Sequence, residues 1–204
     1  GALSSKTRQR PFIGIAGTMG AGKSTLAREL GVALSLPVYQ EPISPYLGDF
    51  YQDPSAWSFH MQAYMIGARS SHAQALGRGG GIQDRTIYED HIFAKMLRAL
   101  GDMTARDFST YDQLRRAVLP VTPEPDLILY LSVSPETSIE RVKGRARGEE
   151  EAVPDAYLRS LCGRYEDWAQ STDRELLRLD WDHPVKLENV LSQIYDQIGG
   201  RYAP

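Results

Sequence analysis

The segment from residue 17 to residue 24 constrains the fold of this chain more than any other part of the sequence. It reads Gly-Thr-Met-Gly-Ala-Gly-Lys-Ser and fits GxxxxGK[ST], the pattern of a phosphate-binding loop. Residues 12–16 before it have the apolar composition of a short buried strand, and residues 24–34 after it have the spacing of an amphipathic helix. This strand–loop–helix context predicts a P-loop that binds a nucleoside triphosphate.

The chemistry of a P-loop explains why these residue types occur together. Glycines let the backbone curl so that successive N–H groups face phosphate oxygens, and the following helix adds the positive end of its dipole. We expect Lys23 to reach the β- and γ-phosphates and the Ser24 hydroxyl to bind Mg²⁺, so ATP and Mg²⁺ are the predicted cofactors. The predicted phosphate-binding residues are Gly17, Thr18, Met19, Gly20, Ala21, Gly22, Lys23, Ser24 and Thr25.

Length and charge limit the remaining possibilities. A chain of 204 residues suits one α/β domain, which we place at residues 11–204 after a flexible N-terminus of residues 1–10. The net charge of −3 argues against nucleic acid as a partner. Because no apolar run approaches the roughly 18 residues that span a bilayer, we expect no membrane association and a cytoplasmic location. Cys162, the single cysteine, cannot form an internal disulfide, which agrees with a reducing compartment.

Strand and helix patterns alternate along the rest of the chain. Further strands are predicted at residues 36–40, 82–84, 127–133 and 176–179, and helices at 54–76, 88–100, 105–119, 135–141, 155–171 and 185–198. Such alternation is typical of an α/β fold. We therefore expect a P-loop kinase fold, that is, a doubly wound parallel five-stranded sheet with helices on both faces and an arginine-rich lid.

Two carboxylates follow predicted strands directly. Glu41 precedes a proline that ends the second strand, and Asp84 ends the third. Ligands of open α/β sheets bind beside the carboxyl ends of the strands, so both side chains should face the cleft of the P-loop. Ser24, Glu41 and Asp84 are accordingly the candidate Mg²⁺ ligands.

A cluster of arginines follows the predicted strand at residues 127–133 and its helix. Arg141, Arg145 and Arg147 fall within the segment 141–152, which also contains two glycines and three glutamates. Mobile arginines can close over a transferring phosphoryl group, stabilise its charge and exclude water. The other interpretation is an ordinary solvated run of charges.

At this point the chain resembles the deoxynucleoside kinase family, from about residue 12 to residue 168. The resemblance rests on several segments. These are the P-loop, Glu41-Pro42, Trp57-Ser58-Phe59 with Gln62 and Arg69, residues 84–90, which read DRTIYED, and residues 141–150 followed by Pro154 and Tyr157-Leu158. It also implies a homodimer. The chain departs from the family at Tyr46, where some members carry tryptophan, and it is one residue shorter than animal members after Asp90.

The resemblance implies a role for each matching position. Glu41 is expected to be the general base for the 5′-hydroxyl of a nucleoside, and Arg85 to hold that hydroxyl and the phosphates. Tyr51 and Glu150 correspond to a pair that binds the 3′-hydroxyl. The base pocket is expected to contain Tyr46, Met61, Gln62, Arg69, Asp90 and Phe93, with Arg69 paired to Asp90 rather than Glu89. Phe93 either stacks on the nucleobase or is an ordinary residue of the hydrophobic core.

Alternatives remain at two levels. A nucleoside monophosphate kinase needs a cationic site for its acceptor phosphate, whereas the expected acceptor site here is polar or acidic. A P-loop switch of the GTPase type would carry an Asn-Lys-x-Asp motif, which the sequence lacks. The residues therefore predict a kinase for a small hydroxyl acceptor, and the resemblance implies an ATP-dependent deoxynucleoside 5′-kinase of nucleotide salvage. Deoxyadenosine is the favoured substrate, deoxyguanosine follows, and deoxycytidine is the alternative.

Overall fold

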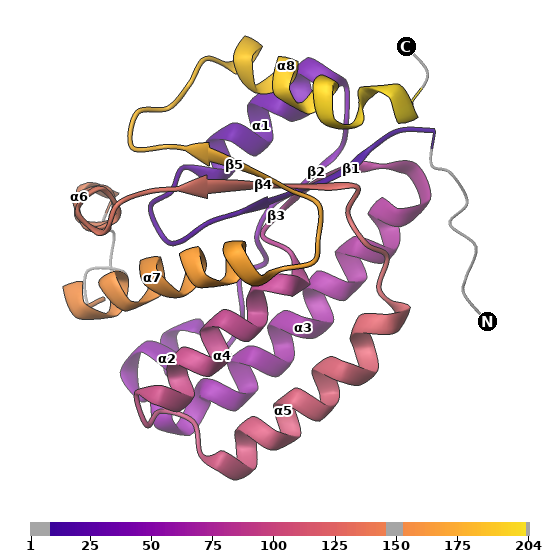
Figure 1. Cartoon of the computed structure of the whole chain (residues 1–204). Helices are drawn as coiled ribbons and strands as arrows, with labels where there is room; N and C mark the ends of the chain where they lie inside the picture. Colours follow the sequence, from indigo (N-terminus) through magenta and orange to yellow (C-terminus); the bar gives the residue numbers. More distant parts are fainter. Residues whose placement is uncertain (1–8, 146–152, 203–204) are drawn as a thin grey trace.

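A parallel sheet organises the protein in this computed structural model, which describes residues 9–145 and 153–202 (Figure 1). The five strands are β1 (Phe12–Ala16), β2 (Val38–Tyr39), β3 (Gly81–Asp84), β4 (Leu127–Ser132) and β5 (Leu176–Asp180). Their order in the sheet is β2-β3-β1-β4-β5, and every pair is parallel. The predicted doubly wound sheet is confirmed.

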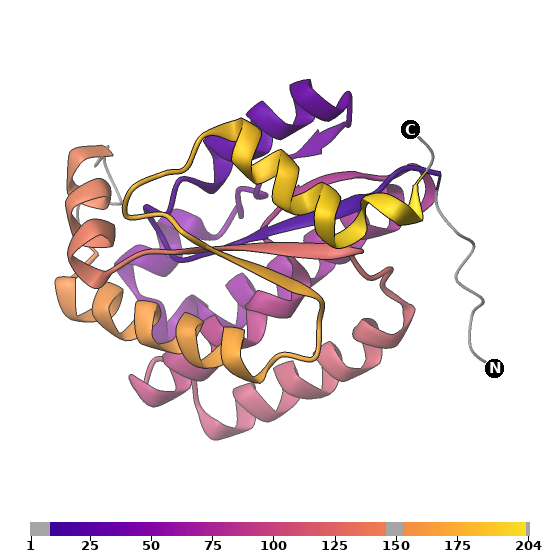
Figure 2. The ribbon, with the colours of Figure 1, turned by 45° about the horizontal axis from the view of Figure 1, so that its top comes forward.

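Helices connect the strands on both faces of the sheet. They are α1 (Lys23–Leu34), α2 (Leu47–Gln52), α3 (Pro54–Gly79), α4 (Asp90–Ala99), α5 (Ala105–Val118), α6 (Pro135–Arg145), α7 (Asp155–Ser171) and α8 (Leu187–Ile198). Single 3-10 turns lie at Ile87–Glu89, Leu119–Val121 and Gly199–Arg201. Figure 2 shows α1 and α8 on one side of the sheet and the larger group of α3, α4, α5 and α7 on the other.

Alternation along the strands divides the core between these two layers. Ile13 and Ile15 of β1 pack in the cluster that contains α1 and α8 residues, whereas Ile128 and Tyr130 of β4 pack with residues of α4 and α7. All six residues of β4 are buried, as expected for a central parallel strand covered on both faces.

The predicted elements differ from the observed ones in a few places. The second strand has only two residues instead of five, because it is an edge strand that pairs with β3 alone. The six-residue helix α2 was not predicted, since a helix this short has too few turns to show a clear period. Helix α3 continues three residues beyond its predicted end and stops where Gly80 takes φ 78°, a left-handed conformation that favours glycine.

Three further findings concern the cysteine, the helices and the N-terminal segment. Cys162 is buried, and within residues 9–145 and 153–202 no helix combines the length and the apolar composition needed to cross a bilayer. The predicted flexible N-terminus lies mostly outside the described residues, although Arg10 donates a hydrogen bond to the carbonyl of Ser35.

Candidate active site

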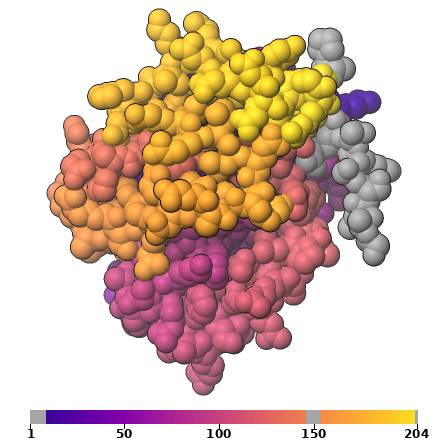
Figure 3. All heavy atoms as spheres, in the orientation of Figure 1, coloured from indigo at the N-terminus to yellow at the C-terminus, as the bar shows by residue number. Residues whose placement is uncertain are grey.

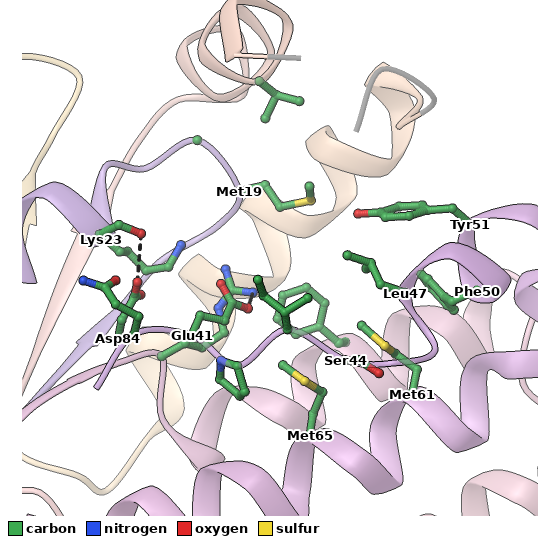
Figure 4. Close-up of a pocket in the computed structure, with 18 of the residues that line it drawn as sticks. Met19, Lys23, Glu41, Ser44, Leu47, Phe50, Tyr51, Met61, Met65 and Asp84 are labelled. Atoms are coloured by element: carbon green, nitrogen blue, oxygen red, sulfur yellow. Dashed lines mark hydrogen bonds and ion pairs between the residues drawn. The ribbon is translucent and has the colours of Figure 1, made fainter. Parts of the chain in front are cut away.

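A cavity of about 420 Å³ opens beside the carboxyl ends of β1 and β3. Figure 4 shows Lys23, Glu41 and Asp84 toward one end of it and Leu47, Phe50 and Tyr51 toward the other. The first group is charged, and the second is mainly apolar. A phosphate-binding end and an organic-binding end therefore share one cavity.

Two glycines give the P-loop its shape. Gly20 and Gly22 have φ values of 74° and 96°, so both take the left-handed conformation that glycine favours. A Cβ on Gly20 would lie 3.0 Å from the carbonyl oxygen of Ser138, a backbone atom that cannot move aside easily. The backbone of α6 thus packs directly against the loop, and Gly22 begins α1 as its N-cap.

Lys23 lies inside the loop. Its ammonium donates a 2.9 Å hydrogen bond to the Thr18 carbonyl, and only 7% of the residue is exposed. Burial, aided by the charge of Arg85, lowers the pKa of Lys23 to about 8. The ammonium is therefore weakly solvated, and anionic oxygen atoms would bind to it strongly.

The candidate metal ligands divide into two places. The Ser24 hydroxyl donates to Oδ2 of Asp84 at 2.9 Å, and the other carboxylate oxygen, Oδ1, is buried without a hydrogen-bond partner among the described residues. Hydroxyl and carboxylate oxygens suit Mg²⁺, so these two residues fit the predicted ion. Glu41, the third candidate, instead contacts arginines.

Glu41 sits between two guanidinium groups. Its Oε1 lies 2.9 Å from Nη1 of Arg85 and 3.3 Å from Nη2 of Arg69. Burial opposes ionisation of this carboxyl, but the two arginines outweigh it and hold the pKa of Glu41 below its ordinary value. The carboxylate is thus ionised at neutral pH and can accept a proton from a hydroxyl.

Arg85 joins this carboxylate to the P-loop. Its Nη2 donates to the Gly17 carbonyl at 2.9 Å, and its guanidinium lies 4.7 Å from the centre of the Phe93 ring. The residue has φ 66°, a left-handed conformation that is uncommon for a residue with a side chain. Such strain is typical of functional positions that the surrounding structure holds in place.

Arg69 forms an ion pair with Asp90, which is fully buried, in agreement with the pairing that the sequence favoured. Neither residue is among those that line the cavity, although Arg69 contacts Glu41, which does. Glu89, the other candidate partner, points to Arg85 and the P-loop.

One polar side chain in the lining of the cavity has a buried atom without a partner. Gln62 on α3 is 6% exposed, and its Oε1 has no hydrogen-bond partner among the described residues. Met61, Phe93 and Tyr51 also line the cavity. Tyr46 does not line it; its ring stacks on Trp57 at 5.6 Å between centroids.

The arginines of the predicted lid are placed differently from one another. Arg145 lines the cavity, whereas Arg141 is anchored by hydrogen bonds to the carbonyls of Gly20, Ala21, Trp181 and Asp182. The Trp181 contact is the shortest, at 2.7 Å. Arg141 therefore joins the P-loop to the segment after β5. Arg147 and Glu150 lie outside the described residues, and Thr25 is exposed on the first turn of α1.

Some residues of the cavity had not been predicted. Leu47 and Phe50 come from the missed helix α2, and Tyr157 comes from the first turn of α7. The pair Tyr157-Leu158 belonged to the family-like sequence, so a signal for Tyr157 existed. Leu47 and Phe50 are apolar, but they lie in a segment whose hydrophobic residues show no clear helical period, so the sequence contained no comparable signal for them.

Known proteins resemble this chain over nearly its full length. The sequence model for the family described as "Deoxynucleoside kinase" matches residues 13–199. Deoxyadenosine kinase of Dictyostelium discoideum is 40% identical over 200 residues, covering 95% of this chain and 82% of the relative. Deoxyadenosine/deoxycytidine kinase of Bacillus subtilis (strain 168) is 37% identical over 198 residues, covering 92% and 91%.

Solved structures agree with these sequence matches. Deoxyadenosine kinase from M. mycoides with bound dATP superposes with a TM-score of 0.81 at 33% identity, covering 90% of this chain and 98% of the other. The same enzyme with bound dCTP gives 0.80 at 32% identity, covering 92% and 98%.

Proposed function

Because this chain belongs to the deoxynucleoside kinase family, we propose that it phosphorylates the 5′-hydroxyl of a purine deoxynucleoside in nucleotide salvage, with deoxyadenosine favoured. The kinase activity follows from the family, since its members are ATP-dependent phosphotransferases. The choice of base and the roles of individual residues are the content of the proposal.

Glu41 is the proposed general base. It is ionised, and both arginine contacts use Oε1, so the second oxygen can accept the proton of a 5′-hydroxyl. A neutral alcohol suits this site, because a carboxylate would repel an acceptor that already carries a phosphate. Arg85 donates hydrogen bonds both to Glu41 and to the Gly17 carbonyl, so it holds the proposed general base and the P-loop at a fixed separation.

Lys23 and the loop N–H groups are proposed to bind the phosphates of ATP, with Arg145 at the rim of the cavity. Ser24 and Asp84 would hold Mg²⁺, which neutralises phosphate charge when bound. Arg147 and Glu150 keep the predicted roles of phosphate and 3′-hydroxyl contacts, with Tyr51 as the partner of Glu150.

Gln62 carries the proposal for the base. Its buried Oε1 needs a donor, and the exocyclic amino group of adenine supplies one beside a ring nitrogen that can accept from the glutamine amide. The N7–O6 edge of guanine offers two acceptors and would leave Oε1 unpaired. The N1–H and O6 of guanine could satisfy both groups of the amide, so Gln62 alone does not exclude deoxyguanosine. The preference for deoxyadenosine is instead supported by the 40% identity to a relative named for deoxyadenosine, against 32% to one named for deoxyguanosine.

Deoxycytidine is the second candidate, because cytosine also presents an amino group beside a ring nitrogen. The relative from B. subtilis is named for both nucleosides, and the M. mycoides enzyme has been solved with dATP and with dCTP. Met61 and Met65 line the cavity, and flexible methionine side chains can adapt to bases of different size.

The test is ATP-dependent phosphorylation measured with each of the four deoxynucleosides and with adenosine. The proposal expects the highest kcat/KM for deoxyadenosine, activity with deoxycytidine below it, and little with thymidine or adenosine. A preference for thymidine, or equal rates with adenosine and deoxyadenosine, would contradict it. Homodimer formation and a cytoplasmic location stay predictions of the sequence.

A further inference from the structure

Each arginine that holds Glu41 has a second, buried carboxylate behind it. Arg69 pairs with Asp90, and the Nε of Arg85 lies 3.7 Å from Oε1 of Glu89. The side chains of Glu89 and Asp90 are both 0% exposed. Two consecutive residues at the start of α4 thus offset the guanidinium charges that act on Glu41 from the other side.

Glu89 does more than offset a charge, because its two oxygens accept from four donors. Oε1 accepts from the Gly17 N–H at 3.2 Å and from the Tyr165 hydroxyl at 2.8 Å. Oε2 accepts from the N–H of Thr86 at 2.7 Å and from its hydroxyl at 3.3 Å. Burial raises the pKa of Glu89, while Arg85 and the Thr86 N–H favour its ionised form.

The first glycine of the P-loop is consequently held at both of its polar atoms. The Gly17 N–H donates to Glu89, and the Gly17 carbonyl accepts from Arg85 at 2.9 Å. Arg85 also contacts Glu41, so one set of hydrogen bonds connects the phosphate-binding loop to the proposed base.

We propose that Glu89 is a positioning residue for phosphoryl transfer, which holds Gly17 and Arg85 in one unit and offsets the guanidinium charge acting on Glu41. The part concerning Glu41 rests on its proposed role as the base. Because in-line transfer depends on the placement of donor and acceptor, a shift of this unit lowers the rate even when both substrates still bind.

Chemistry explains why a carboxylate is needed at this position. A glutamine has one acceptor oxygen and an NH₂ group, so in either orientation its NH₂ faces a backbone N–H, of Gly17 or of Thr86. Two opposed donors in a buried site repel each other and leave one N–H without a partner. Neutral isosteric replacement therefore disturbs the loop without creating a cavity.

Tyr165 gives a second way to test the unit. It lies on α7 and is fully buried, and α7, in orange, crosses the middle of the face seen in Figure 3. Its hydroxyl contacts the same oxygen of Glu89 that accepts from Gly17. Removing the hydroxyl with Tyr165→Phe keeps the ring and leaves the charge of Glu89 in place.

Helix α7 also offers a matched control. Glu166 accepts from the hydroxyl of Tyr130 at 2.8 Å, much as Glu89 accepts from Tyr165, but its hydrogen-bond partners lie on β4 and β5 rather than in the P-loop. Glu166→Gln therefore removes a tyrosine-bonded carboxylate away from the cavity. This variant shows how far kcat falls when a carboxylate that does not contact the P-loop loses its charge.

The experiment compares Glu89→Gln, Tyr165→Phe and Glu166→Gln with the wild type in steady-state kinetics, calorimetric ADP binding and thermal unfolding. For Glu89→Gln we expect kcat to fall about 10- to 100-fold, the KM for the nucleoside to stay within about threefold, and ADP to bind several-fold more weakly. Tyr165→Phe should act in the same direction but less. Glu166→Gln should keep kcat within about twofold, with a smaller loss of thermal stability because the side chain of Glu166 is 33% exposed.

Unchanged kcat and ADP affinity in Glu89→Gln would overturn the proposal, as would an equal loss of kcat in Glu166→Gln. If Glu89→Gln does not fold, wild-type kinetics in Tyr165→Phe would overturn it instead. A wrong base preference would alter which nucleoside the wild type prefers but not the ratio of variant to wild type. If Glu41 is not the general base, Glu41→Gln stays active, whereas the ADP affinity of Glu89→Gln still tests whether Glu89 positions Gly17.

Discussion

Replacing Glu41 by glutamine is the most direct test of the proposed chemistry. The change keeps the shape of the side chain and removes its ability to accept a proton. Both guanidinium contacts use Oε1, at 2.9 Å from Arg85 and 3.3 Å from Arg69, so the amide oxygen of a glutamine can take over both. Its NH₂ group then occupies the place of the second oxygen, where it can only donate.

The expected effect follows from this geometry. Loss of a general base lowers the rate roughly 10²–10⁴-fold, while the nucleoside pocket around Gln62 is unchanged. We therefore expect kcat to fall by this factor and the Kd of the nucleoside to change little. Since the side chain of Glu41 is 35% exposed and keeps its hydrogen bonds, thermal stability should stay close to that of the wild type.

The assay couples ADP formation to a spectrophotometric signal at saturating ATP and nucleoside, with nucleoside binding measured by calorimetry. Glu29→Gln, on the exposed face of α1, is a control for loss of a negative charge. Activity of Glu41→Gln within about threefold of the wild type would refute the assignment, because no base would then be missing. A parallel loss of nucleoside binding would instead identify Glu41 as a binding residue.

Four other outcomes are expected. ADP affinity should fall as the pH rises through about 8. Burial lowers the pKa of Lys23 to about 8, so its side chain is charged below that pH and neutral above it. The same fall in a Lys23→Arg variant would contradict this explanation. Gln62→Leu should lower kcat/KM for deoxyadenosine, because the base loses its hydrogen bonds to the amide, and an unchanged kcat/KM would exclude Gln62 as the base-reading residue. Asp90→Asn leaves the buried charge of Arg69 poorly paired, so the free energy of unfolding measured in urea should fall by about 3–5 kcal/mol. A loss below about 1 kcal/mol is typical of an exposed ion pair and would contradict this prediction. The triphosphate dATP should compete with both ATP and deoxyadenosine, because its base and phosphates would fill both ends of the cavity; competition with ATP alone would limit the contact to the phosphate end.

Local patterns in the sequence determine the phosphate-binding half of the site. The P-loop follows from spacing and residue type within eight positions, and its strand and helix follow from short-range periodicity. Glu41 and Asp84 could be placed in the cleft because the carboxyl ends of parallel strands meet at one edge of a sheet.

Contacts between distant segments were decided only by the tertiary structure. Arg141 looked like a free lid arginine in the sequence, yet packing of α6 against the P-loop anchors it on four carbonyl groups. Tyr46 does not line the cavity, and its ring stacks instead on Trp57 of the following helix.

Glu89 shows the physical reason most clearly. In the sequence, Glu89 was a candidate partner for Arg69 because it stands next to Asp90. In the structure its carboxylate accepts hydrogen bonds from Gly17, 72 residues earlier, and from Tyr165, 76 residues later. Periodicity and motif spacing describe interactions over one or two turns, whereas the pairing of buried charges depends on which side chains the whole fold brings within about 4 Å. The sequence alone therefore determined the class of site and its chemistry, and the packing of α4, α6 and α7 around the P-loop decided how the charges are paired.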